Sequence, residues 1–346
     1  MSARAAGRVR LAISMGDPGG IGPEVVLKAL ATPAVAAAVD PILVGDRAVW
    51  DETARRLRLR VATSETPRPR HLTLTVTSTL PPRHRRPGPT RGKADAAARG
   101  EAAYRAIVEA VRLVQAGRAD AVVTAPISKA HLGAAGHDFP GHTELLANLC
   151  GNVPVRMMMA GPQLRVVLVT THLALAEVPR RLSREAVLDT ILATGLSLRQ
   201  QFRIPTPRIA VTGLNPHAGE NGLFGDEEAR IIAPAIRAAR RRRIDVRGPL
   251  AADSLFAQAA HGQYDAVVCM YHDQGLGPFK LLHFADGVNF TVGLPFVRTS
   301  PDHGTAFDLA GTGTADARSM IAAMQLAARL ARPPTSAVRA RRTRLD

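Results

Sequence analysis

Cysteine is scarce and long apolar runs are missing in this chain of 346 residues. The two cysteines, Cys150 and Cys269, exclude a disulfide scaffold and a zinc finger built from thiolates. No stretch approaches the ~18 apolar residues of a membrane helix, and the run at residues 11–15 is too short for the core of a signal peptide. These absences fit a reducing compartment, and we expect a cytoplasmic protein without a membrane partner.

Aromatic residues make up only 4% of the chain, and arginine almost replaces lysine. The 45 basic residues give a formal net charge of +16, and the lysines among them are Lys28, Lys93, Lys129 and Lys280. Arginines cluster within residues 240–243 and 339–344, but no aromatic residues that could stack on bases accompany them. We therefore interpret both clusters as solvated charge and expect no nucleic-acid partner.

Short segments rich in Val and Ile alternate with longer Ala-rich segments, in a chain long enough for about two domains. Several short segments are apolar throughout, as is typical of strands covered on both faces of a parallel sheet. The alternation predicts an α/β fold. The predicted strands are residues 9–14, 41–45, 72–77, 121–124, 164–170, 208–212, 266–271 and 288–293. The predicted helices are residues 23–31, 94–115, 184–201, 226–241, 254–260 and 315–331.

Two regions depart from this alternation. Residues 62–93 are rich in Pro, Arg and Thr, and we interpret them as a surface excursion that contains one strand. Residues 332–346 begin with two prolines after Arg332 and end in arginines, and we expect a disordered tail there.

Three predicted strands are each followed by a histidine, namely His172, His217 and His272. In open parallel sheets, ligands bind beyond the carboxyl ends of the strands. Three imidazoles that converge there would hold a divalent metal with an open coordination position. Three unrelated loop histidines remain the alternative. A metallohydrolase, with Asp273 or Glu220 as general base, also remains open on this pattern alone.

Other polar residues suit an anionic substrate. His142 lies in a Gly-His-Thr-Glu segment, where it could bind substrate or transfer a proton near neutral pH. Lys280, which we place in a loop after His272, and Arg298 flank Asn289, and both cations suit a phosphate or a carboxylate. A simple helix start and ordinary surface charge are the alternatives.

Two glycine-rich loops follow strands, at residues 16–24 and 303–313. The backbone N–H groups of the first could cradle an anion at the start of a helix. Neither loop matches the G-x-G-x-x-G pattern, so local sequence does not predict a nicotinamide cofactor.

Six segments together resemble the 4-hydroxythreonine-4-phosphate dehydrogenase family. They are residues 16–18 (Gly-Asp-Pro), 141–144 (Gly-His-Thr-Glu), 171–173 (Thr-His-Leu), 215–220 (Asn-Pro-His-Ala-Gly-Glu), 271–275 (Tyr-His-Asp-Gln-Gly) and 293–300 (Gly-Leu-Pro-Phe-Val-Arg-Thr-Ser). The resemblance covers residues 9–331 and implies the isocitrate and isopropylmalate dehydrogenase fold, with two α/β/α domains, a central cleft and a homodimer. We accordingly expect one discontinuous domain from residues 1–128 and 300–331, and a second from residues 129–299.

The resemblance also implies the site. The divalent-metal ligands would be His172, His217 and His272, assembled across the dimer interface, with zinc, magnesium or cobalt as the metal. The substrate-binding residues would be His142, Thr143, Lys280, Asn289 and Arg298. The loop at 303–313 looks like the adenine-side loop of isopropylmalate dehydrogenases, which gives as NAD or NADP ligands His303, Gly304, Thr305, Ala306, Asp308 and Gly311.

The implied reaction is oxidation of the C3 hydroxyl of 4-phosphooxy-L-threonine by NAD(P)+. The product is a keto acid that loses CO2 to give 3-amino-2-oxopropyl phosphate, on the way to pyridoxal 5′-phosphate. Gly19 stands where vitamin-pathway members usually have Ala, and residues 220–226 and 277–282 look closer to a sister branch that oxidises D-threonate or D-erythronate 4-phosphate. A branch that acts on terephthalate dihydrodiol fits less well, because residues 141–144 and the Asn289/Arg298 pair are intact.

Overall fold

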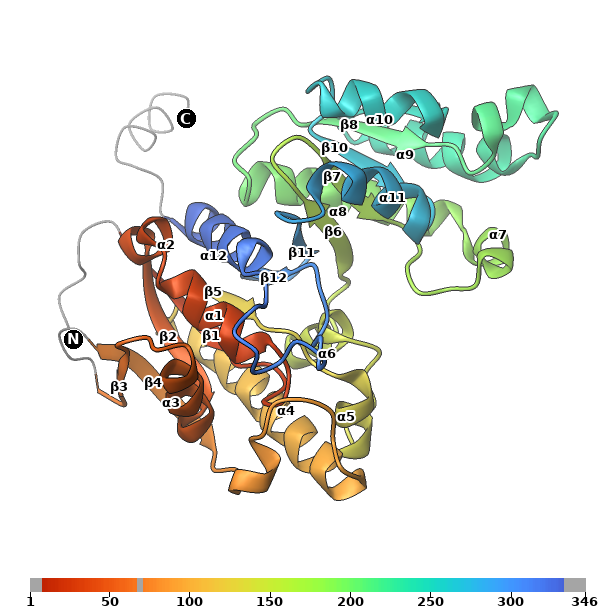
Figure 1. Cartoon of the computed structure of the whole chain (residues 1–346). Coiled ribbons are helices and arrows are strands. Elements are labelled where there is room, and N and C mark those ends of the chain that lie inside the picture. Colours follow the sequence, from red (N-terminus) through yellow and green to blue (C-terminus); the bar gives the residue numbers. More distant parts are fainter. Residues whose placement is uncertain (1–7, 67–70, 333–346) are drawn as a thin grey trace, which may run out of the picture. The chain divides into compact units, whose positions relative to one another are not determined.

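The computed structural model describes residues 8–66 and 71–332, so the predicted tail beyond Arg332, with the arginines at 339–344, lies outside the described residues. The chain divides into two compact units (Figure 1). The first contains residues 1–135, 305–315 and 324–346, and the second contains residues 136–304 and 316–323. Both have helices around a sheet, so the predicted α/β class is confirmed.

The first unit is built on five parallel strands in the order β3-β4-β2-β1-β5. The strands are β1 (Val9–Ser14), β2 (Val39–Asp46), β3 (Ala62–Ser64), β4 (His71–Ser78) and β5 (Ala121–Thr124). The helices are α1 (Gly22–Leu30), α2 (Pro33–Ala38), α3 (Arg47–Arg56), α4 (Lys93–Gln115) and α5 (Lys129–Ala134), with a short 3-10 turn η1 (Pro82–His84). Every residue of β5 is buried, which explains why an apolar run of four residues was recognisable as a strand.

The second unit has seven strands in the order β12-β11-β6-β7-β10-β8-β9. They are β6 (Arg156–Ala160), β7 (Arg165–Leu168), β8 (Arg208–Thr212), β9 (Asp245–Leu250), β10 (Ala266–Cys269), β11 (Val288–Val292) and β12 (Val297–Pro301). The last helix, α12 (Arg318–Ala331), starts in this unit and ends in the first. The other helical segments are α6 (His142–Leu149), η2 (Leu175–Glu177), α7 (Val178–Arg181), α8 (Arg184–Gln200), η3 (Pro216–Gly222), the π-helix η4 (Glu228–Ile232), α9 (Ala233–Arg241), α10 (Ala252–Ala260) and α11 (His272–His283).

The strands of the second unit pair in both directions, whereas the sequence predicts parallel strands. β7, β10, β8 and β9 are parallel, but β6, β11 and β12 pair antiparallel. The reversal begins at a tight turn between β6 and β7, where Gly161 N donates to Leu164 O at 2.9 Å. Such a short connection forces antiparallel pairing, because a parallel pair needs a long crossover.

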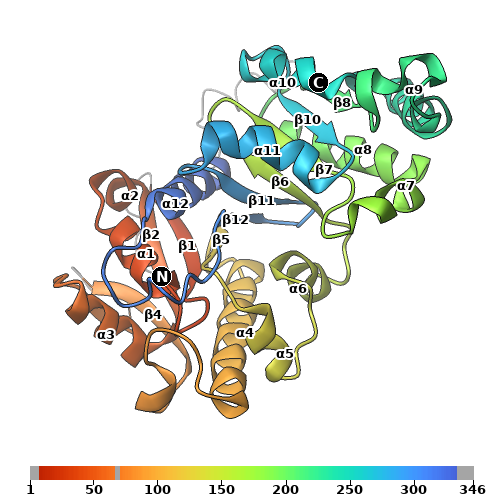
Figure 2. The same cartoon turned by 45° about the vertical axis from the view of Figure 1, so that its right-hand side comes forward.

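Lys280 lies in helix α11, and the sequence-based prediction that placed it in a loop is therefore wrong. Gly275, Gly277 and Pro278 resemble helix breakers, yet residues 272–283 form one helix. Its Leu276 and Phe279 are buried in the cluster that β7 and β10 also line, and Figure 2 shows α11 lying along these strands. Burial of this face outweighs the weak helix propensity of the three residues.

The unit boundaries also differ from the predicted domains. Residues 129–135 belong to the first unit, because α5 packs against α4. Residues 300–304 and 316–323 belong to the second, in keeping with the antiparallel pairing of β12 with β11. The region at 62–93 contributes two strands to the first sheet rather than a single strand on an excursion.

Among the described residues, no helix is long and apolar enough to cross a membrane.

Candidate functional site

His172 and His272 lie side by side beyond two neighbouring parallel strands. Their ring centroids are 5.7 Å apart. The chain segments stay paired past the strand ends, where Val169 N donates to Cys269 O at 2.9 Å and Thr170 Oγ1 donates to Met270 O at 2.7 Å. The pairing of β7 with β10 therefore brings the two imidazoles together, as expected for residues at one edge of a sheet.

His272 begins helix α11, and its Nδ1 lies 2.7 Å from Asp273 Oδ1. A carboxylate on one ring nitrogen fixes the ring orientation and directs the other nitrogen outward, an arrangement common among metal-binding histidines. Both His172 and the carboxyl group of Asp273 are exposed. A ligand from solvent can therefore reach the imidazoles of His172 and His272.

His217 follows β8 on a different local structure. It starts five consecutive residues with positive φ, and its ring centroid lies 6.2 Å from that of Phe224. Within residues 8–66 and 71–332, no group of three or more His, Cys, Asp or Glu side chains is placed to hold a metal ion. Within one chain, the structure thus brings His172 and His272 together. His217 does not join them in a group of three ligands.

Gln274 connects the ends of β8 and β10, a role that the sequence analysis missed. Its Oε1 accepts hydrogen bonds from Met270 N at 2.7 Å and Thr212 Oγ1 at 2.8 Å, while its Nε2 donates to Gly213 O at 2.7 Å. Every polar atom of the amide is therefore engaged with a strand end, and the segments that lead to His217 and His272 are held in register.

Arg298 is a buried cation on β12, only 1% exposed. Its Nη1 donates to Thr291 Oγ1 at 3.0 Å, across the pairing of β11 with β12. Burial lowers the pKa of Arg298 to about 9, and the Glu144 carboxylate opposes this shift. On β11, Asn289 Oδ1 is buried and has no hydrogen-bond partner within the described residues. A buried cation and a buried acceptor on adjacent strands can bind a polar ligand.

Lys280 lies eight residues after His272 on α11, which separates the two by ~12 Å along the helix axis. Its Nζ is 2.9 Å from Asp302 Oδ2 and 5.7 Å from the centroid of the Phe284 ring. His142 and Thr143 occupy the first turn of α6, followed by Glu144. All five residues predicted to bind substrate lie in the second unit, as do the three histidines.

The predicted cofactor loop is divided between the units: His303 and Gly304 belong to the second and residues 305–315 to the first. In the first unit the loop packs on the Gly-rich loop, where Ile21 N donates to Thr305 O at 2.9 Å. Its far end is held by α1. Lys28 Nζ donates to Gly313 O at 2.7 Å and to Ala315 O at 2.8 Å.

A small pocket of about 40 Å³, partly open to solvent, lies between these two loops in the first unit. It is lined by Pro18, Gly20, Pro23, Glu24, Thr53, Arg56, Leu57, Pro87, Gly311, Thr312 and Gly313. Neighbouring segments pack tightly against two of its glycines: a Cβ on Gly20 would stand 3.0 Å from Thr305 O, and one on Gly311 would stand 2.8 Å from Pro87 Cβ. Ala306 and Asp308 are on the same loop but do not line this pocket.

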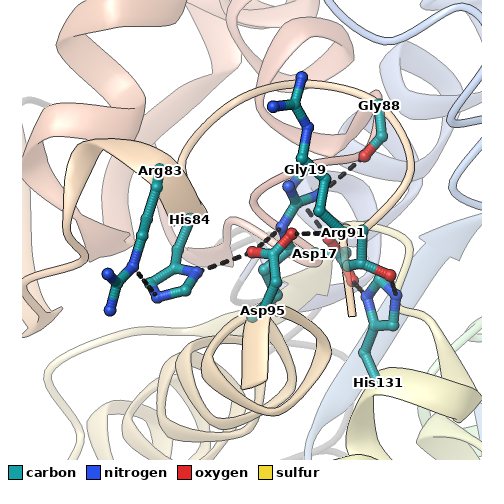
Figure 3. Close-up of polar contacts among 10 residues, drawn as sticks. Asp17, Gly19, Arg83, His84, Gly88, Arg91, Asp95 and His131 are labelled. Atoms are coloured by element: carbon teal, nitrogen blue, oxygen red, sulfur yellow. Dashed lines mark hydrogen bonds and ion pairs between the residues drawn. The ribbon is translucent and has the colours of Figure 1, made fainter. Parts of the chain in front are cut away.

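A buried polar network supports the Gly-rich loop from below (Figure 3). Asp17, fully buried, accepts from Gly19 N at 2.9 Å and lies 2.5 Å from His131 Nδ1. The ring of His131 also packs 5.3 Å from that of Phe307 in the cofactor loop. The Gly-rich loop and the cofactor loop are therefore joined through one imidazole.

The second part of this network begins on α4. Asp95 Oδ1 lies 2.8 Å from His84 Nδ1 and 3.1 Å from Arg99 Nε (Figure 3). Arg99 Nη1 in turn donates to Gly88 O at 2.7 Å, and Gly88 N donates to Gly19 O at 2.8 Å. Sequence analysis missed these residues, because they lie in or beside the region interpreted as an excursion, and no local pattern links them.

A family described as pyridoxal phosphate biosynthetic protein PdxA matches residues 37–327. The 4-hydroxythreonine-4-phosphate dehydrogenase of Geobacter metallireducens is 55% identical over 93% of this chain and 96% of its own. The D-threonate 4-phosphate dehydrogenase of Cupriavidus necator is 47% identical over 93% and 97%. The crystal structure of a 4-hydroxythreonine-4-phosphate dehydrogenase from Burkholderia phymatum aligns with a TM-score of 0.81 at 43% identity, over 94% of this chain and 99% of its own.

The family match spans most of the chain, and these relatives cover nearly all of it at high identity. The likeness to a solved structure extends over both units. The resemblance that six short segments indicated is therefore confirmed, and the chain belongs to the PdxA family.

Proposed function

We propose that the protein is a metal-dependent NAD(P)+ dehydrogenase of a phosphorylated four-carbon hydroxy acid. The observation that carries this proposal is the 5.7 Å separation of the His172 and His272 ring centroids, together with the position of His272 at the start of the helix that also bears Lys280. One element thus presents a metal-ligand candidate at its start and a cation ~12 Å farther along. The dehydrogenase names of the relatives support the same reaction class.

The residues present fit a divalent metal. The imidazoles of His172 and His272 are exposed or partly exposed, and Asp273 orients one of them. Imidazole ligands favour zinc or cobalt, whereas magnesium prefers oxygen ligands. When bound, such a metal supplies a Lewis acid that polarises the oxygen of the substrate hydroxyl. His217 would complete the ligand set.

We propose that His217 reaches the site as the ligand from the partner in a homodimer. Large apolar side chains are exposed on the segments that carry all three histidines. Leu173 and Leu175 follow His172, Leu223 follows His217, and Leu281 and Phe284 lie at the end of α11. Leu281 is 86% exposed and Phe284 is 79% exposed, so a second copy that covered them would bury apolar surface at the far end of the helix that His272 begins.

The substrate would bind through its charged groups. Lys280 and the buried Arg298 supply cations for a phosphate and a carboxylate, and Asn289 Oδ1 supplies a buried acceptor. His142 and Thr143 would contact substrate from the first turn of α6. Fixing both ends of a four-carbon chain orients the hydroxyl-bearing carbon for hydride transfer.

The coenzyme NAD or NADP would bind at the loop that contains His303, Gly304, Thr305, Ala306, Asp308 and Gly311. The support in this chain is the pocket of the first unit, whose lining includes Gly20 and Gly311, one from each glycine-rich loop. Glycines in a lining present backbone without a side chain, which a dinucleotide can approach closely. When bound there, the coenzyme would supply the acceptor for the hydride of the substrate carbon.

The leading substrate is 4-phosphooxy-L-threonine, whose keto acid product loses CO2 to give 3-amino-2-oxopropyl phosphate for pyridoxal 5′-phosphate synthesis. The alternative is D-threonate or D-erythronate 4-phosphate, because relatives of both names align over nearly the whole chain. We propose a cytoplasmic location for either role.

The test is absorbance at 340 nm on mixing enzyme, NAD+ or NADP+, and each of the three phosphorylated substrates. The proposal expects reduced coenzyme with one substrate preferred, loss of activity after chelation, and recovery on adding zinc or cobalt. A metallohydrolase would release phosphate or another cleavage product with no change at 340 nm, and that result would overturn the proposal.

A further inference from the structure

His217 lies on a backbone conformation that residues with a side chain rarely adopt. The φ angles of residues 217–221 are 51°, 53°, 84°, 42° and 54°, so a whole turn of chain is left-handed. Only one of these five residues, Gly219, is a glycine. Left-handed helical turns are disfavoured for L-residues because the Cβ approaches the following carbonyl oxygen, so the surrounding structure must hold this turn in place.

The carboxylate of Glu228 holds the entrance of the turn. Glu228 is 6% exposed, and its Oε1 accepts hydrogen bonds from Leu214 N at 2.7 Å and Asn215 N at 2.8 Å. Its Oε2 accepts a third, from Asn215 Nδ2 at 3.0 Å. The backbone just before His217 is therefore fastened by one buried acceptor, and hydrogen bonds to a charged acceptor are among the strong ones.

Two glycines let the carboxylate reach this position. A Cβ on Gly213 would stand 3.0 Å from Glu228 Oε1, and a Cβ on Gly219 would stand 2.8 Å from Oε2. Glu228 is also the first residue of the π-helix η4, a local widening that is frequent at functional sites. Gly213 and Gly219 both leave space for the Glu228 carboxylate, and the π-helix begins at the same residue. The local structure therefore accommodates this carboxylate specifically.

We propose that Glu228 is a positioning residue for His217, which holds the left-handed turn so that the imidazole is presented as a metal ligand. This inference rests on the proposed metal site. The argument is geometric: Glu228 contacts the two residues that enter the turn and packs against Gly219 inside it. Without the carboxylate, two partly buried N–H groups lose their acceptor and the turn loses its anchor.

The test measures metal affinity directly, by calorimetry with Zn²⁺ or Co²⁺ on the metal-stripped, full-length protein. Glu228→Gln replaces one oxygen by an amide group, which sets a donor against the donors of Asn215. We expect the affinity to fall roughly ten- to a hundredfold, as is usual when a partner of a metal ligand is lost. Coenzyme binding to the metal-free protein should not change, and excess metal should restore most of kcat.

A matched control is Asp226→Asn, which removes the same charge two residues away. The Asp226 side chain is 69% exposed and pairs with Arg230 on the surface, so the control should bind metal like the wild type. An equal loss of affinity in this variant would show that net charge, and not the anchor, decides binding, and would overturn the inference.

A double-mutant cycle with His217→Ala decides whether Glu228 acts through this histidine. If it does, adding Glu228→Gln to His217→Ala costs no further affinity. Fully additive losses, or a wild-type affinity in Glu228→Gln alone, overturn the positioning role. An unchanged affinity in His217→Ala alone overturns the proposed metal site instead, so the two failures are distinguishable.

If Glu228→Gln does not fold, Gly219→Ala provides a second variant that keeps the carboxylate. Its new Cβ would stand 2.8 Å from Glu228 Oε2, so the anchor and the turn cannot both stay in place. We expect weaker metal binding and rescue by excess metal here too. A folded Gly219→Ala protein with wild-type affinity would contradict the inference.

Discussion

Gly19 lies directly against the guanidinium of Arg99. A Cβ on Gly19 would stand 1.8 Å from Arg99 Nη1, and the guanidinium cannot simply turn away, because it is bonded to Gly88 O at 2.7 Å and to Asp95 at 3.1 Å. Arg99 can therefore occupy its buried position only because residue 19 has no side chain. This ties the Gly-rich loop to α4.

Gly19→Ala should lower the free energy of unfolding by about 1–3 kcal/mol, the usual cost of overpacking a filled interior. The substitution should also raise KM for the coenzyme, since the neighbours Pro18 and Gly20 line the proposed pocket. Urea denaturation and steady-state kinetics check both. Gly133→Ala is the control, because a Cβ there has no neighbour within 4 Å, and it should leave stability unchanged or slightly raised.

The hydrogen bonds around Asp95 predict acid sensitivity. Burial by itself raises the pKa of Asp95, but bonds from His84, the Arg91 backbone and Arg99 together hold it below the ordinary value of 3.8. A carboxyl group whose pKa is lower in the folded state stabilises the protein above ~3.8, and this stabilisation is lost as the pH falls through the folded value. Asp95→Asn should therefore be less stable at pH 7 by about 1–3 kcal/mol, with the two proteins converging below pH ~3.8.

Unfolding free energies between pH 7 and 3 check this prediction. Glu65→Gln serves as the control, because Glu65 forms an exposed ion pair with Arg47. Exposed pairs contribute little, so this variant should follow the wild-type curve within about 0.5 kcal/mol. A constant gap between wild type and Asp95→Asn at all pH values would contradict the argument.

Mixed dimers should reveal how the metal ligands are shared. Because His172 and His272 adjoin each other in one chain, a shared site would combine this pair with the partner's His217. Mixing inactive His172→Ala and His217→Ala proteins then restores one intact site in each hybrid, or about a quarter of wild-type activity for random assortment. Mixing His172→Ala with His272→Ala should restore nothing. Recovery in the second mixture would show instead that the His172 and the His272 of one site come from different chains.

Lys280→Ala should lower kcat/KM by about one to two decades, because a charge-assisted hydrogen bond contributes about 1.5–3 kcal/mol. The loss should appear in kcat as well as KM if phosphate binding positions the hydroxyl. Metal affinity should be unchanged. A substrate analogue without phosphate gives the comparison: an equal loss on both substrates would assign Lys280 to the chemistry rather than to phosphate binding.

Sequence predicted the fold where apolar runs are continuous and failed where tertiary contacts decide. β1, β5 and β8 were placed with their observed bounds. β6 was missed, because its Arg156-Met-Met-Met run has no β-branched residue. α11 was missed for a similar reason: its glycines and proline suggested a loop, but burial of Phe279 stabilises the helix.

The site divides in the same way. The closeness of His172 and His272 could be anticipated, since each follows a buried strand. Strand order could not, and it is the position of β10 between β7 and β8 that makes Gln274 a bridge between strand ends. Glu228 and Arg99 carry no recognisable motif, because their roles depend on glycines that face them from other segments.

The hydrogen bonds between α1 and residues 313 and 315 have a consequence for the folding of the chain during translation. Glu24 accepts from Ala315 N at 3.0 Å and Lys28 donates to Gly313 O, so the first helix of the chain binds a segment made nearly 290 residues later. During translation at ~5–20 residues per second, the ribosome needs roughly 8–35 s to make the residues between 135 and 305. Over that interval the nascent first unit lacks one wall of the proposed coenzyme pocket, so we expect it to bind coenzyme only once residues 311–313 have been made.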